Sequence, residues 1–180
     1  KRYKHTLNVK NMAVELALRY GADPEKAVLA GLLHDAAKEL PRPEMLQIFK
    51  ENAIMAKNAE QRPFPVWHGI AAAILCMTRW GVADPEILSA IECHTTGKVN
   101  MSLLDKVLYM ADATSAERDY PGVEQLRREQ LQDLDLATLH CMEQSIAVVR
   151  DKGGELDPET VAACEDLRRR IAGHTVRPNT

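Results

Sequence analysis

Apolar residues recur along the chain at steps of three and four, which is the period of an amphipathic helix. Ile87 and Ile91 stand four residues apart, and Leu104 and Leu108 repeat this step. No segment alternates apolar and polar residues for long enough to indicate a strand. The pattern predicts an all-α protein, with helices at about 4–20, 24–38, 43–52, 68–80, 85–94, 103–114, 123–132, 134–152 and 158–172.

Helix-start signals support these boundaries. The triplet Asp-Pro-Glu occurs at 23–25, 84–86 and 157–159, with Asp as N-cap, Pro at the first helical position and Glu beside the positive end of the helix dipole. Ser102 and Asp105 have the spacing of a capping box. Glycines and prolines fall between the predicted helices, so each helix has a predicted end as well as a start.

Composition agrees with a helical fold. The chain has 180 residues, of which 46% are hydrophobic and only 4% aromatic. A chain of this size can bury a core without disulfides, and the scarcity of aromatic side chains favours helix over sheet. We therefore expect a single helical bundle over residues 1–172, followed by a frayed C-terminal tail at 173–180.

Charge and cysteine usage narrow the class of partner. The formal net charge is −3, which argues against nucleic acid or an anionic membrane surface as the partner. No apolar run approaches the roughly 18 residues of a membrane span. The four cysteines form no C-x-x-C pair, which predicts reduced thiols and a cytoplasmic location. Nothing in the sequence specifies an oligomeric state.

Several polar residues stand on the apolar face of predicted helices. His5 shares a face with Val9 and Met12, and His94 and Asp112 each close an apolar stripe. His34 and Asp35 end the largely apolar run 27–33. Because an unpaired buried polar group is costly, these side chains need partners.

A shared cation satisfies such a set. A single inward histidine is more often a packed core residue than a ligand, but several inward histidines and aspartates together indicate a metal centre. The adjacent His34 and Asp35 can approach one ion from two directions, and a carboxylate can also bridge to a second ion. Imidazole and carboxylate without thiolate suit iron or manganese better than a structural zinc.

Two basic residues lie near this predicted centre. Lys38 follows Asp35 by three residues, so its ammonium can contact a phosphate oxygen, although a solvated lysine at a helix end fits the spacing equally well. Arg2 lies one turn before His5, where a guanidinium can fork onto a phosphate; a frayed terminal arginine is the simpler interpretation.

The order of these residues resembles the metal signature of the HD superfamily. More closely, the chain is similar to the YqeK family, whose members hydrolyse diadenosine tetraphosphate symmetrically to two ADP. The matching segments are Arg2-Tyr3-x-His5, Ala30-Gly31-Leu32-Leu33-His34-Asp35-x-x-Lys38, His68-Gly69, His94-Thr95-Thr96-Gly97, Met101-Ser102-x-Leu104-Asp105-Lys106, Ala111-Asp112 and Arg118-Asp119-x-Pro121-Gly122.

The resemblance implies specific roles for these residues. One ion, expected to be iron with manganese as the alternative, would be held by His5, His34, Asp35 and Asp112, and a second by Asp35, His68 and His94. Asp35 and Lys38 would be catalytic. Arg2, Lys38, Thr95, Thr96, Gly97 and Arg118 would contact the nucleotide. The chain departs from the family pattern at Ala36, where tyrosine is common, and at 113–116, where an aromatic, aliphatic, Glu, Pro run is typical.

The expected activity is therefore symmetrical hydrolysis of diadenosine tetraphosphate by a hydroxide that bridges two metal ions. Two alternatives stay open: an HD phosphohydrolase for another nucleotide, such as a nucleoside di- or triphosphate, and a module that senses a nucleotide without turnover. His140 and His174 match no motif and are expected to be surface or packing residues.

Overall fold

The computed structural model describes residues 2–57 and 59–175 and contains ten α-helices and two 3₁₀ helices in those ranges, with no strand among them. The prediction of an all-α fold is confirmed. The helices are α1 (Arg2–Tyr20), α2 (Pro24–Leu33), α3 (Arg42–Glu51), α4 (Ala53–Ala56), η1 (Ala59–Gln61), η2 (Phe64–Val66), α5 (Trp67–Trp80), α6 (Pro85–Cys93), α7 (Leu103–Thr114), α8 (Val123–Glu129), α9 (Leu134–Asp151) and α10 (Pro158–Thr175).

The predicted caps are present. Asp23 caps α2 by accepting hydrogen bonds from the backbone nitrogens of Glu25 and Lys26, at 2.8 and 3.2 Å. Asp84 does the same at the start of α6, and Ser102 with Asp105 forms the capping box of α7. These contacts satisfy amide donors that a helix start leaves without an intrahelical acceptor.

The predicted end of the second helix at 38 is wrong, because α2 ends at Leu33. Residues 34–39 form successive turns, in which the backbone nitrogens of Ala36 and Lys38 each donate to the carbonyl three residues earlier, at 3.0 Å. The His34 ring donates to the Gly31 carbonyl, 2.8 Å away, and so takes the place of a continuing helix. His34 and Asp35 therefore stand on a tight turn at a helix end.

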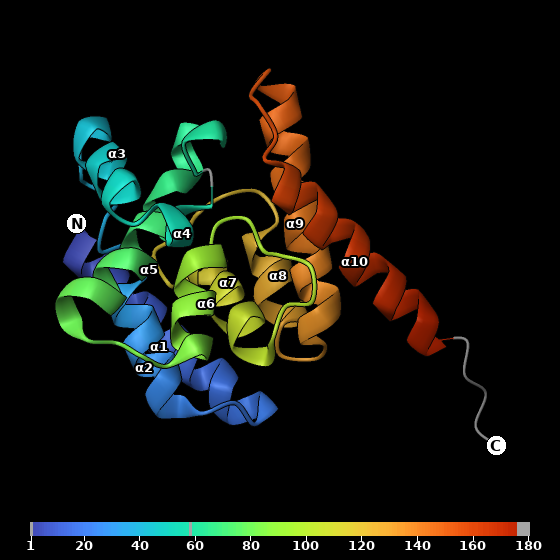
Figure 1. The fold of residues 1–180 in the computed structure, drawn as a ribbon. Helices are drawn as coiled ribbons and strands as arrows, with labels where there is room; N and C mark the ends of the chain where they lie inside the picture. The colour runs from blue at the N-terminus through green and yellow to red at the C-terminus, as the bar shows by residue number, and fades with distance from the viewer. Residues whose placement is uncertain (1, 58, 176–180) are drawn as a thin grey trace.

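Five helices build the body of the molecule. α1 packs against α2 and α7, α6 lies against α2, α5 and α7, and α3 covers the start of α5. α9 and α10 pair at one side, where α9 contacts α7 (Figure 1). Leu16, Ile91, Leu108 and Met110 are among the fully buried side chains of the single core cluster.

Two glycines allow helices to approach closely beside the predicted ligands. A Cβ added to Gly31 would lie 2.7 Å from the Cα of Lys10 in α1. A Cβ added to Gly69 would lie 2.7 Å from the backbone oxygen of Glu92 in α6. Each glycine is within three residues of a predicted ligand, His34 or His68, so helix spacing and ligand position are set together.

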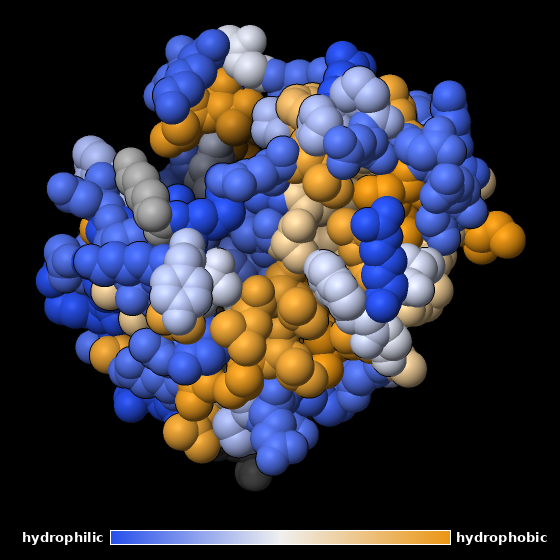
Figure 2. Space-filling model, turned by 90° about the vertical axis from the view of Figure 1, so that its left-hand side faces the viewer, coloured by the Kyte–Doolittle hydropathy of each residue, from blue (hydrophilic) through white to orange (hydrophobic). Residues whose placement is uncertain are grey.

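Figure 2 shows a face with mostly hydrophilic side chains, a large hydrophobic area near and below its centre, and smaller hydrophobic areas elsewhere. Among the described residues no helix combines the length and hydropathy that crossing a bilayer requires. α10 continues to Thr175, past the expected start of the tail at 173. Residues 176–180 and the side chain of His174 lie outside the described part of the chain.

Gly31→Ala is expected to lower the free energy of unfolding by about 1–3 kcal/mol, because the new methyl group meets backbone that cannot move aside. Denaturant unfolding of the two proteins measures the difference. Gly173→Ala is the control, since an added Cβ there has no heavy atom within 4 Å. Its replacement should be neutral or stabilising by up to about 1 kcal/mol. Equal stability of the two variants would contradict a tight α1–α2 contact.

Candidate metal centre and adjoining cavities

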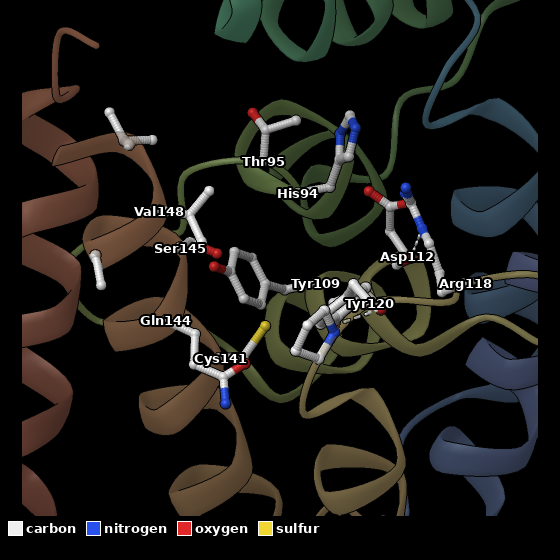
Figure 3. A pocket seen from close by; sticks show the side chains of 14 residues that line it. His94, Thr95, Tyr109, Asp112, Arg118, Tyr120, Cys141, Gln144, Ser145 and Val148 are labelled. Carbon is white, nitrogen blue, oxygen red and sulfur yellow. Dashed lines mark hydrogen bonds and ion pairs between the residues drawn. The ribbon is translucent and has the colours of Figure 1, made fainter. Parts of the chain in front are cut away.

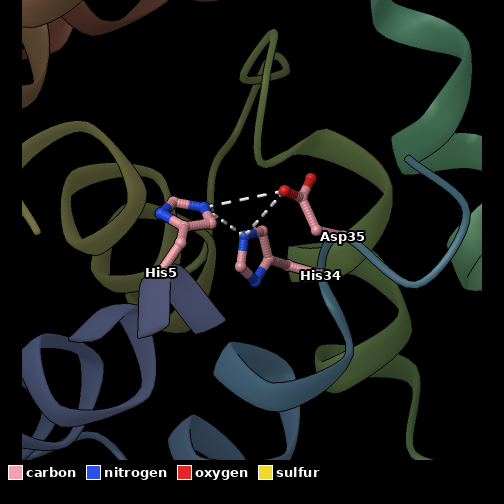
Figure 4. Close-up of side chains that lie close together, drawn as sticks. All are labelled: His5, His34 and Asp35. Atoms are coloured by element: carbon pink, nitrogen blue, oxygen red, sulfur yellow. Dashed lines mark hydrogen bonds and ion pairs between the residues drawn. The ribbon is translucent and has the colours of Figure 1, made fainter. Parts of the chain in front are cut away.

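Three side chains from α1 and the turn after α2 point toward one another (Figure 4). The Nε2 atoms of His5 and His34 are 3.3 Å apart. The Oδ2 atom of Asp35 lies 3.6 Å from the first and 3.7 Å from the second. These atoms form one group that can hold a cation.

The other oxygen of Asp35 faces a second pair of histidines. Oδ1 lies 3.3 Å from Nε2 of His68 and 3.7 Å from Nε2 of His94. The two Nε2 atoms are 3.1 Å apart. One carboxylate thus presents a different oxygen to each histidine pair, which is the arrangement expected of a bridge between two cations.

Asp112 of α7 completes the cluster. Its Oδ1 atom lies 3.3 Å from Nε2 of His5. Ligand atoms of His34, His94 and Asp112 also lie within 4.8 Å of one another. The structure therefore brings all six predicted ligands to one place: His5, His34, Asp35, His68, His94 and Asp112.

The histidine rings are held by their outer nitrogens. Nδ1 of His34, His68 and His94 lies 2.8, 2.9 and 2.7 Å from the backbone oxygens of Gly31, Pro65 and Ile91. A carbonyl oxygen only accepts, so each Nδ1 carries the hydrogen and donates it. In a neutral ring, Nε2 then keeps its lone pair, and it points into the cluster.

Charge in the cluster fits a cation. Burial lowers the pKa of His34 to about 4, so its ring is neutral at physiological pH. Burial alone would raise the pKa of Asp35, but the adjacent His68 and His94 side chains outweigh it and hold the pKa well below the usual value. At Asp112 burial and the adjacent His5 side chain oppose each other in the same way, and the pKa is again well below normal. The neutral His34 ring and the two ionised carboxylates converge as acceptors, which favours bound positive charge.

Three basic side chains line the rim of this cluster. Lys38 Nζ is 3.0 Å from Nε2 of His68 and 4.0 Å from Oδ1 of Asp35. Arg2 Nη1 donates to Oδ2 of Asp35 at 3.0 Å. Arg118 donates through Nε to the backbone oxygen of Asp112 at 2.9 Å and pairs with its carboxylate through Nη2. Each cation therefore already contacts a predicted ligand.

Two cavities open beside the cluster and share Asp112, Arg118 and Tyr120 in their walls. One, of about 590 Å³, is polar and includes Arg2 and Lys38. The other, of about 630 Å³, lies between α7 and α9. Figure 3 shows His94, Asp112 and Arg118 at one end of it and the α9 side chains Ser145 and Val148 at the other. Charged and apolar parts of one ligand can thus be bound side by side.

Comparison with known proteins identifies the family of this chain. A family model described as HD domain matches residues 2–117. This chain belongs to the HD domain family. The expectation drawn from the motif residues is confirmed.

Relatives of this HD protein extend over most of its length. It is 38% identical over 159 residues to a protein of Bacillus subtilis named "Bis(5'-nucleosyl)-tetraphosphatase, symmetrical", covering 88% of this chain and 85% of that one. A protein of the same name from Halalkalibacterium halodurans is 34% identical over 166 residues, with coverages of 92% and 88%. The crystal structure of a Clostridium acetobutylicum protein described as a predicted HD superfamily hydrolase involved in NAD metabolism superposes with a TM-score of 0.90 at 42% identity, covering 94% of this chain and 90% of that one.

The three residues of the predicted nucleotide-binding turn line two different cavities in this HD fold. Thr95 lines the cavity between α7 and α9, and its buried hydroxyl has no hydrogen-bond partner among the described residues. Thr96 is buried and donates to the Gly97 carbonyl at 2.9 Å. Thr96 and Gly97 line a different cavity, of about 610 Å³, that contains none of the six predicted ligands. Only Thr95 of the three lies beside the candidate site.

The sequence interpretation missed Glu117. Its Oε1 atom accepts a hydrogen bond from Nδ1 of His5. Burial alone would raise the Glu117 pKa, but hydrogen bonds from His5, Asn8 and Ser115 lower it to about 2. No periodic signal marks this residue, because it lies in the irregular segment between α7 and α8; its position next to Arg118 was the available clue. His140, expected to be a surface or packing residue, pairs with Glu129 at 2.9 Å.

Asp35→Ala is expected to remove both ions and reduce hydrolysis to background, because Asp35 turns one carboxylate oxygen toward each histidine pair. Metal content of the purified variant, measured by inductively coupled plasma mass spectrometry, tests this. His140→Ala is the matched control and should keep full metal content and activity within about twofold. Two metals retained in Asp35→Ala would rule out the bridging role.

Proposed function

We propose that this HD protein hydrolyses diadenosine tetraphosphate symmetrically to two ADP. The observation that carries the proposal is the meeting of a two-part histidine and aspartate cluster with a polar and an apolar cavity at Asp112 and Arg118. Metal ligands alone fit many reactions. Cavities for a phosphate chain and a nucleoside beside those ligands favour a nucleotide substrate.

The names of the relatives support the choice of nucleotide. Two proteins that this chain covers over 85% and 88% of their lengths are named symmetrical bis(5'-nucleosyl)-tetraphosphatases. That name denotes cleavage at the middle of a tetraphosphate chain, which yields two nucleoside diphosphates. An activity on another nucleotide, or nucleotide sensing without turnover, has no comparable support.

The residues of the cluster would hold two transition-metal ions, with Asp35 between them. We expect iron, or manganese as the alternative, since the donors are imidazole nitrogens and carboxylate oxygens without a thiolate. Such ions, when bound, lower the pKa of water toward neutrality and stabilise charge on phosphate oxygens. The neutral His34 ring and the ionised carboxylates described above are in the protonation states that metal binding requires.

The phosphate chain would lie in the polar cavity, among Arg2, Lys38 and Arg118. Burial lowers the pKa of the Lys38 ammonium, while Asp35 and Asp112 oppose that shift. Lys38 and Arg118 are placed to offset charge on non-bridging oxygens as the anhydride bond breaks and ADP leaves. Arg2 extends the positive charge toward the open side of the cavity, where its side chain is 41% exposed.

One nucleoside would occupy the cavity between α7 and α9. Tyr109 and Tyr120 supply aromatic surface, and the unpartnered hydroxyl of Thr95 can donate to an oxygen of the ligand. A nucleoside bound in this cavity beside the cluster would fix which phosphate is attacked, and so would favour cleavage at one position of the chain.

The cysteines and the net charge indicate where the protein is located and what kind of partner it binds. We expect a cytoplasmic protein, since all four cysteines are free and buried, as reducing conditions allow. The net charge of −3 favours a small anionic substrate met by local basic residues over nucleic acid or a membrane surface.

Arg118→Ala is expected to lower kcat/KM for diadenosine tetraphosphate by about ten- to a hundredfold, the effect of losing a charge-assisted contact. Metal content should stay unchanged, because removing a positive charge beside the cluster cannot repel a cation. Steady-state kinetics with metal analysis measure both quantities. Arg168→Ala removes an arginine paired with Glu143 away from both cavities and serves as the control. Metal loss in Arg118→Ala would make Arg118 a support for Asp112.

Hydrolysis in ¹⁸O-labelled water is expected to give ADP alone, with one labelled oxygen in the terminal phosphate of one of the two products. Attack on either central phosphorus with ADP as the leaving group requires this outcome. Chromatography and mass spectrometry of the products measure it. ATP with AMP would contradict symmetrical cleavage. Absence of turnover by metal-loaded protein would contradict the enzyme assignment.

A further inference from the structure

His5 differs from the other three histidines of the cluster in what holds its ring. His34, His68 and His94 each donate from Nδ1 to the backbone carbonyl three residues earlier. Nδ1 of His5 contacts the carboxylate of Glu117, which is 112 residues away in the sequence. A carboxylate is charged and accepts a stronger hydrogen bond than a neutral carbonyl does, so the His5 ring is held more strongly than the other three.

The Glu117 carboxylate is itself fixed. Oε1 accepts from the Ser115 hydroxyl at 2.8 Å, and Oε2 accepts from Nδ2 of Asn8 at 2.6 Å. Asn8 lies three residues after His5 in α1, so one helix supplies both the ring and a donor that orients the ring's acceptor. The side chain of Glu117 is only 28% exposed.

The backbone of the segment that carries Glu117 is held by hydrogen bonds from Arg127. Arg127 of α8 donates to the backbone oxygens of Thr114, Ser115 and Arg118, at 3.0, 2.8 and 2.9 Å. Three contacts to consecutive turns of an irregular segment leave the loop little freedom. The carboxylate therefore has a defined position relative to α1.

We propose that Glu117 is a positioning residue that holds the His5 ring with Nε2 directed at Asp35 and Asp112. The inference rests on the metal centre proposed above and is independent of the substrate. Glu117 contacts the outer side of the ring and belongs to none of the candidate ligand groups, so it acts through His5. As a hydrogen-bond acceptor it selects the tautomer with a free Nε2 lone pair and makes that nitrogen a better donor to a cation.

This role accounts for a departure from the family pattern. Ser115 stands where a glutamate is typical of the family that the chain resembles, and in this chain the serine hydroxyl donates to Glu117. The carboxylate of this loop is thus present two residues later and bound to a ligand. The same loop carries Arg118, so the contact also links a proposed phosphate-binding residue to the metal centre.

The test compares Mn²⁺ affinity in Glu117→Ala, Glu117→Gln and wild-type protein, by competition of the Mn²⁺-loaded proteins with a chelator. We expect Glu117→Ala to weaken affinity by about ten- to a hundredfold, the usual cost of losing such a partner. Glu117→Gln keeps an amide oxygen as acceptor and should lose less than about tenfold. Glu129→Ala is the matched control, because it removes a carboxylate from Nδ1 of His140 outside the site, and it should stay within about twofold.

Two further readouts separate positioning from general support of the fold. Two-bond ¹H–¹⁵N correlation spectra of protein freed of metal by a chelator should show His5 as the Nδ1–H tautomer in wild type. In Glu117→Ala the population of the Nε2–H tautomer of His5 should increase. At saturating Mn²⁺ the variant should bind the full number of ions and recover kcat with an unchanged KM. Wild-type Mn²⁺ affinity and an unchanged tautomer in Glu117→Ala would overturn the proposal. It would also be overturned if Glu129→Ala lost as much Mn²⁺ affinity as Glu117→Ala. The Mn²⁺ affinity and the His5 tautomer are measured without substrate, so these two readouts stand even if diadenosine tetraphosphate is not the substrate.

Discussion

The arrangement of the site depends on one buried carboxylate. Asp35 turns its two oxygens toward two different pairs of histidines, and each of those rings has already used its outer nitrogen as a donor. A cluster of lone pairs and negative charge this close together is costly in a protein interior unless positive charge joins it. Lys38, Arg2 and Arg118 contact the rim of the cluster, so its negative charge also holds three basic side chains beside it.

Helix ends deliver these side chains. His34 and His94 follow the last residues of α2 and α6, where the final carbonyls of a helix lack backbone partners. Their rings donate to those carbonyls, which satisfies the helix end and aims Nε2 inward with a single hydrogen bond. Gly31 and Gly69 then let α1 approach α2, and α5 approach α6, until the rings meet. The same contacts therefore end the helices, set the spacing between them and orient the predicted ligands.

The loop between α7 and α8 joins the histidine and aspartate cluster to the two adjoining cavities. Asp112 ends one side of the cluster, Glu117 holds His5, and Arg118 lies in the walls of both cavities. Arg127 fixes this loop through three backbone oxygens. A substitution in this loop is therefore expected to alter both the proposed metal affinity and the proposed substrate contacts.

The sequence by itself determined most of the helices, their caps and five of the six residues that gather at the centre, because periodicity, Asp-Pro-Glu starts and inward polar groups are local signals. The sixth residue, His68, was expected only from the family resemblance. It placed the end of α2 five residues too late, since a ring-to-carbonyl bond that stops a helix leaves no mark in the pattern. Only the tertiary structure decided that the two Asp35 oxygens face separate pairs, that Thr96 and Gly97 belong to another cavity and that Glu117 reaches His5 across 112 residues. Such contacts depend on distances between helices far apart in the chain, and spacing along a sequence carries no information about them.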